Sequence, residues 1–510
     1  GFDKAVLATS FNARDPGVRP ELLVEANDAG DVQGALQLAR ENLWQVSIVS
    51  GGHSWAQNHI RDGGLLLSMA RFNQITIDPV TRIALVGPGC WGLDLDNALR
   101  KHGLFFPIAH APDVAMGGFL LQGGFGWGSR ELGLATESLI GIDLVLADGR
   151  QVHASASENA DLFWAARGSG PGFFAVVLRY HLKLHPRKNV TALKMQVFRE
   201  RHLEHVFRWA DDIGSAVPQS IEFQILITPK ALGIFQPGIE VIAPVLADSW
   251  TDAREAVRFI SDSPIRKLAS FTTPLVPMNT SLMSRAANIT HFPPDVRWCT
   301  DNIWTDAPID DLLPGLRAIA ATMPPAPSHS LWLNWHPSQQ RPDMAFSLEA
   351  NRYLAVYGEW TRGEDDDRYA NWATERMAAM QAMMNSMSPE QRAQMQQLSD
   401  QLMDDMDLQW QMQQLSGNLQ QMFPQMQWNQ SYDFDGQDPM GMGQAMQQMQ
   451  ELGDLDQLEN LLRNASSPSA LAEADMDKVR DLMGDDAAKS LGRLAELTKQ
   501  LEEAGLIEQK

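Results

Sequence analysis

The pattern of hydrophobic and polar positions over residues 1–190 alternates short apolar runs with glycine- and proline-rich turns. Runs of this length, rich in branched residues, are typical of buried strands, and we expect strands at 45–49, 83–86 and 142–146. Between them, residues 31–41 repeat apolar positions at helical spacing, with one face made of Val32, Ala35, Leu36 and Ala39. The pattern predicts an α+β domain over residues 1–190.

A second stretch, residues 191–380, mixes the same signals. Residues 221–227 alternate between apolar and polar positions, and residues 353–360 form another strand-like run. Residues 251–261 and 309–323 have helical periodicity, and Thr251 is placed to cap the first of these helices. We therefore expect a second α+β domain here.

The composition of the chain changes near Met377. Of its 24 methionines, 17 lie from Met377 onward, most of them in a Met/Gln-rich segment at 381–450. Residues 451–510 then carry amphipathic helical stripes, one of which is formed by Leu455, Leu458, Leu461 and Leu462. Because Met/Gln-rich sequence has little to bury in a core, we expect a mostly helical, partly disordered C-terminal region.

The chain is acidic, since 63 Asp and Glu residues against 41 Lys and Arg residues give a formal charge of −22. Such a surface repels phosphate backbones and anionic lipids, so we expect no nucleic-acid partner and no membrane partner. No apolar run approaches the roughly 18–20 residues of a spanning helix, and residues 1–4 do not begin a secretory signal. Two cysteines, Cys90 and Cys299, are too few for a disulfide framework or a cysteine cluster. We expect a cytoplasmic protein without a metal site.

The first candidate for chemistry is the loop Ser50-Gly51-Gly52-His53-Ser54, which follows a predicted strand. Its consecutive backbone N–H groups, free of bulky side chains, can form a nest around a pyrophosphate. His53 near its end would bring a nucleophilic imidazole beside a bound cofactor. Taken alone, the peptide also fits an ordinary glycine turn with a surface histidine.

Two further glycine-rich segments follow in the chain, at 111–128 and 161–177. The first carries the pairs Gly117-Gly118 and Gly123-Gly124, six residues apart, which allow backbone to pack flat against a ligand. Residues 87–92 also fit G-x-G-x-x-G, but no acidic residue closes a second strand about 20 residues on, as a dinucleotide fold would require. We interpret 87–92 as a structural turn, with Cys90 as a small buried side chain.

Together with Val145-Leu146-Ala147-Asp148-Gly149, the three glycine segments resemble the FAD-binding PCMH-type oxidoreductases, in the berberine-bridge-enzyme-like branch of the vanillyl-alcohol-oxidase superfamily. The resemblance covers residues 8–190 closely and 191–380 more loosely. Ala115 and Gln122 depart from it, because the family usually has glycine at both positions. It implies a two-subdomain FAD-binding domain at 1–190 followed by a substrate domain at 191–380.

The resemblance also implies FAD as the cofactor, with a covalent bond from His53 to the 8α-methyl group of the flavin. Many members attach the flavin a second time through a cysteine, and Ala111 stands at that position here, so we expect a single link. The cofactor-binding residues that it implies are Ser50, Gly51, Gly52, His53, Ser54, Val114, Gly117, Gly118, Gly123, Gly124, Gly126 and Ile142.

The implied reaction is hydride transfer from a C–H bond of an alcohol, sugar or amine to flavin N5, with molecular oxygen as the usual acceptor. A base should then take a proton from the substrate hydroxyl or amine. Tyr353, Tyr357 and Glu359 share one face of a predicted strand and are candidates, as is His110 before the second glycine segment. Residues of these types on a strand face are also common as half-exposed packing.

The C-terminal region departs from this family, whose closing segment over the cofactor has no match here. Residues 387–510 instead resemble the helical region that precedes a von Willebrand factor A domain in bacterial proteins, without that domain's metal motif. This suggests a fusion, or a joining of unrelated reading frames, near 380–388. Three hypotheses follow: an active FAD-dependent oxidoreductase, a flavin-binding but inactive protein, or an interaction protein whose C-terminal helices recruit a protein partner.

Overall fold

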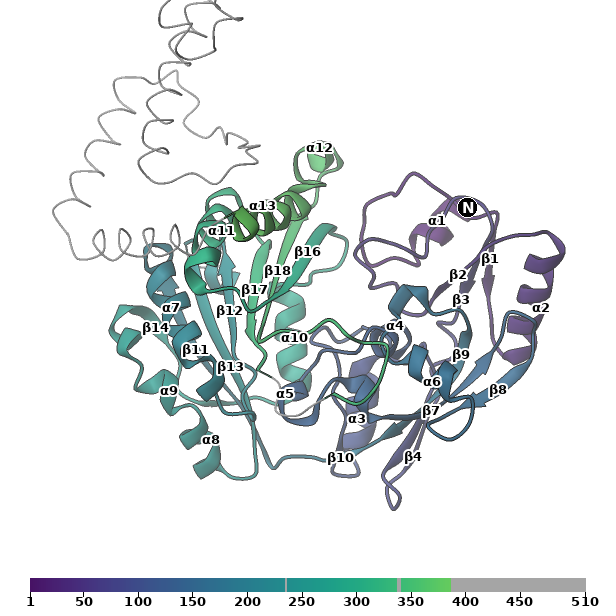
Figure 1. The fold of residues 1–510 in the computed structure, drawn as a ribbon, viewed down its shortest axis with the longest axis horizontal. Helices are drawn as coiled ribbons and strands as arrows, with labels where there is room; N and C mark the ends of the chain where they lie inside the picture. Colours follow the sequence, from purple (N-terminus) through teal and green to yellow (C-terminus); the bar gives the residue numbers. More distant parts are fainter. Residues whose placement is uncertain (234–235, 337–340, 387–510) are drawn as a thin grey trace, which may run out of the picture. The chain divides into compact units, whose positions relative to one another are not determined.

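The computed structural model describes residues 1–233, 236–336 and 341–386. Residues Gly1–Met384 form one compact unit (Figure 1). The expectations for the Met/Gln-rich segment and the C-terminal helices fall, from residue 387 onward, outside the described residues. Within the described ranges, no helix combines the length and the hydropathy that crossing a membrane requires.

The N-terminal part begins with α1 (Phe2–Leu7) and a small parallel sheet. Its strands, in spatial order, are β1 (Leu22–Glu25), β3 (Leu65–Ser68) and β2 (Val46–Val49). Helix α2 (Ala29–Glu41) buries the predicted face of Val32, Ala35, Leu36 and Ala39 against Leu65 and Leu67. The helix begins two residues earlier than expected because the Asp28 side chain accepts a hydrogen bond from the Asp31 backbone N–H at 3.0 Å.

A second, antiparallel sheet follows in the same half of the unit (Figure 1). Its strands, in spatial order, are β4 (Ile75–Asp78), β5 (Ile83–Val86), β9 (Val176–Lys183), β7 (Leu139–Val145) and β8 (Gln151–Ala154). Shorter elements complete this half: α3 (Gly92–Arg100), α4 (Met116–Leu121), α5 (Ser129–Leu132), α6 (Ala160–Ala166) and the paired β6 (Leu104–Phe105) and β10 (His185–Pro186). Strand β5 has the predicted bounds, whereas β7 begins three residues early because Leu139 already pairs with β9.

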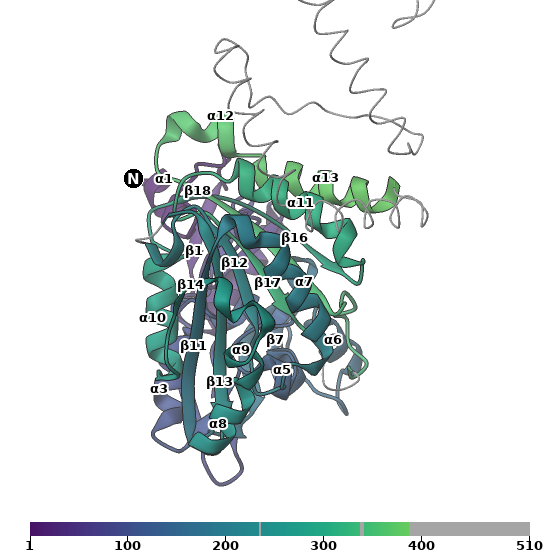
Figure 2. The ribbon, with the colours of Figure 1, turned by 90° about the vertical axis from the view of Figure 1, so that its left-hand side faces the viewer.

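The second half is built on an eight-stranded antiparallel sheet. Its strands, in spatial order, are β14 (Ala269–Thr272), β11 (Val190–Arg199), β13 (Gly238–Ala247), β12 (Gln224–Thr228), β17 (His329–Asn334), β18 (Arg352–Trp360) and β16 (Arg297–Thr305), with β15 (Val276–Pro277) also pairing β11. One face is covered by α7 (Leu203–Ile213), α8 (Trp250–Ala256), α9 (Arg258–Ser261), α11 (Ile309–Thr322) and α13 (Trp372–Ser386), as Figure 2 shows. The remaining helices are α10 (Thr280–Thr290) and α12 (Asp366–Tyr369).

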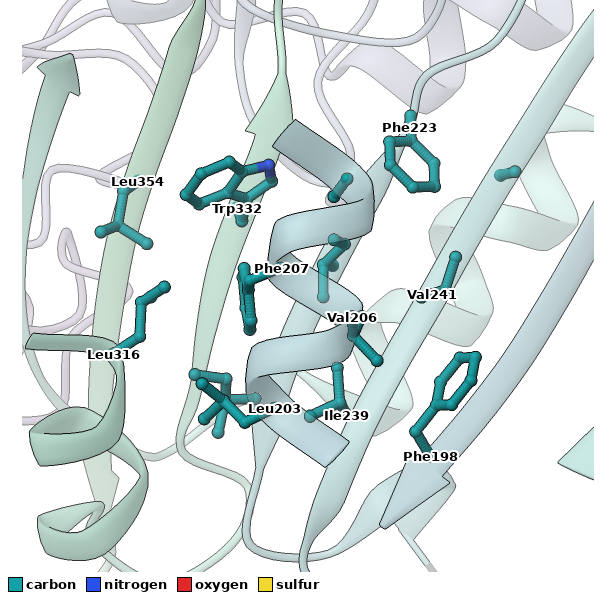
Figure 3. Packing of buried hydrophobic residues seen from close by; sticks show 14 of the residues in the cluster. Phe198, Leu203, Val206, Phe207, Phe223, Ile239, Val241, Leu316, Trp332 and Leu354 are labelled. Atoms are coloured by element: carbon teal, nitrogen blue, oxygen red, sulfur yellow. The ribbon is translucent and has the colours of Figure 1, made fainter. Parts of the chain in front are cut away.

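The largest hydrophobic core lies between this sheet and its covering helices. Phe207 of α7 packs edge-on against Trp332 of β17, with ring centroids 5.3 Å apart, and Leu354 of β18 belongs to the same cluster (Figure 3). Because strand side chains alternate between faces, burying Leu354 and Val356 on the helix side turns Tyr353 and Tyr357 to the opposite side. The core thereby determines which residues of β18 are free to build a site.

Two sequence expectations for this half are wrong in detail. The helix expected over 251–261 is two helices, α8 and α9, that meet at Val257, and its cap is Ser249, whose hydroxyl accepts from the Asp252 N–H at 3.1 Å. Thr251 lies inside α8, since the chain is already helical at Trp250. The strand expected from residue 221 begins at Gln224, because Ile221 forms only an isolated bridge to Val245.

Candidate active site

A cavity of about 990 Å³ lies between the glycine segments of the N-terminal half and the exposed face of the large sheet. This volume is at the upper end of the range for small-molecule and cofactor sites, as a dinucleotide together with a substrate would require. Twelve of the sequence-predicted site residues lie on its wall. The second half contributes Tyr353 and Tyr357, and the first half contributes Ser50, Gly51, Gly52, His53, Ser54, His110, Val114, Gly117, Gly118 and Gly124.

The first two glycine segments pack directly against each other. A side chain at Gly117 would collide with the Ser50 hydroxyl, and one at Gly52, where φ is +70°, would collide with the Thr9 carbonyl. Gly118 differs, because an added Cβ there meets no atom within 4 Å. It lies on the cavity wall, so its backbone is open to a ligand. These features fit the FAD that the sequence predicts.

The His53 ring is held at the end of the first loop by an aromatic and an acidic neighbour. It stacks on Phe11, with centroids 4.3 Å apart and planes 21° apart, and its Nε2 lies 3.2 Å from Oδ1 of Asp113. Burial raises the pKa of Asp113, but the adjacent His53 ring outweighs burial, and the net pKa lies below the ordinary value. The Asp113 carboxylate is therefore charged at neutral pH and faces Nε2 of the imidazole.

His110 forms a close pair with an acid from the other half of the unit. Its Nε2 lies 2.5 Å from Oε1 of Glu222, whose side chain is only 3% exposed. The Gln224 side-chain amide donates a hydrogen bond to the same carboxylate oxygen at 2.5 Å. The Trp127 ring lies edge-on to the imidazole, with ring centroids 4.4 Å apart. The imidazole is thus held in one orientation on the cavity wall.

Tyr353 and Tyr357 stand on the cavity side of β18, as the period of the strand predicts. Burial raises the pKa of Tyr353 to about 12. Burial, together with the neighbouring Tyr353 hydroxyl, raises the pKa of Tyr357 well above its ordinary value. Both phenols are therefore protonated at neutral pH, and each can donate a hydrogen bond.

Glu359 shares that strand face but does not reach the cavity wall. Its side chain is fully buried, and Oε1 lies 3.1 Å from Nδ1 of the equally buried His329. Burial raises the pKa of Glu359 and lowers the pKa of His329. The His329 ring in turn stacks on Tyr357 at 4.7 Å. Glu359 thus lies behind Tyr357, because β18 continues past the edge of the cavity.

Three predicted cofactor-binding residues also lie off the cavity wall. Ile142 is fully buried within the core beneath β7. The α-carbon of Gly126 faces the Ile108 carbonyl, and the α-carbon of Gly123 faces the Phe346 ring. These residues support the shape of the site from behind, since close approach of chain to chain, rather than chain to ligand, explains both glycines.

The third glycine segment holds a loop from the other half. The Phe346 N–H donates to the Arg167 carbonyl at 2.9 Å, and the Trp164 indole donates to Asp343 Oδ1 at 2.9 Å. A side chain at Gly168 would collide with the Phe346 backbone. Phe346 itself reaches the cavity wall, so this segment closes one side of the cavity.

Aromatic rings make up much of the cavity wall on the sheet side. The ring centroid of Trp55 lies 4.6 Å from that of Trp298 and 5.9 Å from that of Tyr357. The ring centroids of Trp304 and Tyr353 are 5.0 Å apart. Sequence reasoning missed these rings, along with Asp113 and Glu222. Glu222 is 112 residues from His110 and carried no local signal. Asp113 was inside a glycine segment, but its contact with His53 depends on how two loops meet.

The chain is similar to known flavoproteins. A family model described as "FAD binding domain" matches residues 20–155. The chain is 33% identical to FAD-linked oxidoreductase ptmO of Penicillium ochrochloron over 380 residues, 72% of this chain and 81% of that protein. It is 32% identical to a carbohydrate oxidase of Microdochium nivale over 260 residues, 48% of this chain and 50% of that protein. It is 36% identical to (R)-6-hydroxynicotine oxidase of Paenarthrobacter nicotinovorans over 172 residues, 33% and 37% of the two chains.

The solved structure of a berberine-bridge-enzyme-like protein, Physcomitrella patens BBE-like 1, has the same fold. The TM-score is 0.65 at 19% sequence identity, and the match covers 75% of this chain and 84% of that one. The expected α+β fold, an FAD-binding domain of the PCMH type followed by a substrate domain, is confirmed. The expected cofactor, FAD, is confirmed as well.

Proposed function

We propose that this chain, which belongs to the family of FAD-linked oxidoreductases, oxidises a small alcohol, sugar or amine in the cavity described above. The observation that carries the proposal is that one cavity joins the open backbone of Gly118 and the His53 loop to the His110–Glu222 pair and the β18 tyrosines. FAD, when bound, supplies the acceptor for a hydride from the substrate and passes the electrons on to molecular oxygen. The residues of the chain bind the flavin, orient the substrate and take up the substrate's proton.

His53 is proposed as the single covalent anchor of the flavin, through its Nδ1 atom. The charged Asp113 carboxylate, 3.2 Å from Nε2, favours the tautomer that carries its proton on Nε2. Nδ1 then keeps the lone pair that a nucleophile needs. Ala111, at the position of the second attachment in relatives with two links, has no side-chain nucleophile.

His110 is proposed as the base that takes the substrate proton. Its partner Glu222 is buried and 2.5 Å away, so the imidazolium formed by proton uptake would be stabilised by an adjacent carboxylate. Tyr353 and Tyr357 fit the complementary role, because the raised pKa of each phenol keeps it a hydrogen-bond donor. They would orient the substrate oxygen or nitrogen while His110 accepts the proton.

The aromatic wall favours a neutral substrate with a ring that can stack. Trp55, Trp298 and Trp304 offer such faces, and both sugars and heteroaromatic rings bind to aromatic side chains of this kind. The names of two relatives, a carbohydrate oxidase and a hydroxynicotine oxidase, support these substrate classes and oxygen as the acceptor.

The experiment is a substrate panel on the purified, flavin-loaded full chain. Flavin bleaching under anaerobic conditions and peroxide release in air are followed with alcohols, sugars and heterocyclic amines. We expect at least one class to bleach the flavin, and His110→Ala to slow bleaching by roughly 10²–10⁴-fold, the usual contribution of a general base. His102→Ala is the matched control, since His102 is exposed outside the cavity. A flavin that no class reduces would overturn the proposal and favour an inactive flavin-binding protein.

A further inference from the structure

A cluster of two histidines and one aspartate lies on the five-stranded sheet, outside the cavity. It consists of Asp143 on β7, His153 on β8 and His181 on β9, three strands that are neighbours in the sheet (Figure 1). Asp143 Oδ1 is 2.8 Å from Nδ1 of His153, and Asp143 Oδ2 is 3.1 Å from Nε2 of His181. One ligand atom from each residue lies within 4.8 Å of the other two.

The register of the strands brings the three side chains to one face. Asp143 pairs directly with His153 across β7 and β8. On β9 it pairs with Arg179, and His181, two residues further, pairs with Gly141, so His181 is a diagonal neighbour of Asp143 on the same face. Gly141 has a role here, since a Cβ at that position would come within 2.9 Å of the His153 ring. The glycine leaves the space in which the imidazole lies over the sheet.

We propose that Asp143, His153 and His181 bind a zinc ion. Two imidazole nitrogens and one carboxylate oxygen are a common zinc ligand set, with bonds of about 2.0–2.2 Å. The observed separations require only small side-chain rotations for the three atoms to converge on one ion. The side chains are 36%, 24% and 30% exposed for His153, His181 and Asp143, so an ion can enter and keep water at a fourth position.

No local motif marks this site in the sequence, because its members are 10 and 38 residues apart. Without an ion, the aspartate accepts hydrogen bonds from both imidazoles, which is the competing structural explanation. The Arg179 guanidinium lies 3.7 Å from Asp143 Oδ2 and is 53% exposed, so it would compete with zinc for the carboxylate.

Zinc at this site would link three strands that support the cavity from behind. Ile142 and Tyr180, next to Asp143 and His181 in the chain, are fully buried on the other side of the sheet. The Tyr180 hydroxyl donates to the Gly117 carbonyl at 2.9 Å and thereby supports the second glycine segment. An ion that binds the folded chain and not the unfolded one raises its stability in proportion to the logarithm of the ion concentration.

The test is calorimetric titration of zinc chloride into the chelator-treated, desalted full chain with its flavin. We expect one zinc bound per chain and a melting temperature that rises with zinc concentration. His153→Ala and His181→Ala should each abolish this binding, and Arg179→Ala should tighten it, because the competing cation is lost. His205→Ala is the control, since His205 contacts the His202 ring on the surface and does not belong to the cluster.

A measurement on the unaltered protein removes any dependence on how the variants fold. Zinc should protect His153 and His181 from carbethoxylation by diethyl pyrocarbonate, read by peptide mass spectrometry, while the exposed His102 stays reactive. The proposal would be overturned if His205→Ala were the only variant to lose zinc binding. It would also be overturned if His153 and His181 reacted equally with and without zinc.

Discussion

Arg130 joins the two halves of the unit next to the candidate base, and its replacement should lower the stability of the fold. Its side chain is only 2% exposed, and its guanidinium donates to the Trp335 carbonyl at 2.8 Å, to the Pro218 and Ile221 carbonyls at 2.9 and 2.6 Å, and to the Val217 carbonyl at 3.2 Å. Burial lowers the pKa of Arg130 to about 10, which leaves it charged at neutral pH. These bonds hold the turn that leads into Glu222.

Replacing Arg130 with Met keeps much of the apolar volume and removes all four hydrogen bonds. Leaving one buried acceptor without a donor costs about 1–3 kcal/mol, so losing the Arg130 donor at several carbonyls together should destabilise the protein by about 3–5 kcal/mol. With an unfolding entropy of about 2.1 cal/mol/K per residue over residues 1–384, each kcal/mol lowers the melting temperature by about 1.2 °C. We therefore expect a melting temperature roughly 4–6 °C lower.

The assay is thermal and urea unfolding of Arg130→Met beside Arg150→Met. Arg150 is 70% exposed and pairs with Asp148 on the surface, so its loss should change stability by no more than about 0.5 kcal/mol. Arg130→Lys keeps the charge but offers a single ammonium group, so its stability should fall between those of the parent and Arg130→Met. Equal stability of the two Met variants would mean that these hydrogen bonds make no net contribution to the stability of the folded chain.

Three further predictions concern the site and the pH dependence of folding. Asp113→Asn removes the charge beside His53 Nε2 and should slow covalent flavin attachment, measured as acid-stable flavin against time; an unchanged rate would contradict the tautomer argument. Tyr357→Phe should lower kcat/KM by roughly 10–100-fold with flavin content unchanged, the loss expected for one hydrogen bond to the substrate; normal turnover would exclude Tyr357 as a substrate donor. Burial lowers the pKa values of His59 and His291 from 6.5 to about 4, so between these values the unfolded chain binds more protons than the folded chain. The free energy of unfolding should therefore fall as the pH drops from 6.5 to 4, by up to roughly 3 kcal/mol per histidine. In urea unfolding, His291→Gln should show a shallower fall with pH, and a slope equal to the parent's would contradict this prediction.

The sequence predicted the fold well where short-range patterns and glycine order carry the information. The helix face of α2 and the strands β5 and β18 follow from periodicity, and the glycine segments alone indicate FAD binding. Helix breaks such as that at Val257 were missed, because the apolar period continues across α8 and α9.

The chemistry of the site was predicted in part, because half of each pair is remote in sequence. His53 and His110 could be identified from their loops, but Asp113 and Glu222 become their partners only after folding. Glu359 shows the opposite case: the strand period correctly put it on the face of Tyr353 and Tyr357, but periodicity cannot tell where along a strand a cavity ends. The zinc cluster likewise depends on strand register, which no local motif records.

We propose that FAD occupies the cavity and is attached to His53. The most direct measurement is mass spectrometry of the acid-denatured full chain, followed by peptide mapping. We expect a mass increase of one FAD less two hydrogens on the peptide that contains His53. In His53→Ala we expect an unmodified mass and flavin that dissociates. A wild-type chain that releases all its flavin on denaturation, or carries it on another residue, would exclude His53 as the attachment.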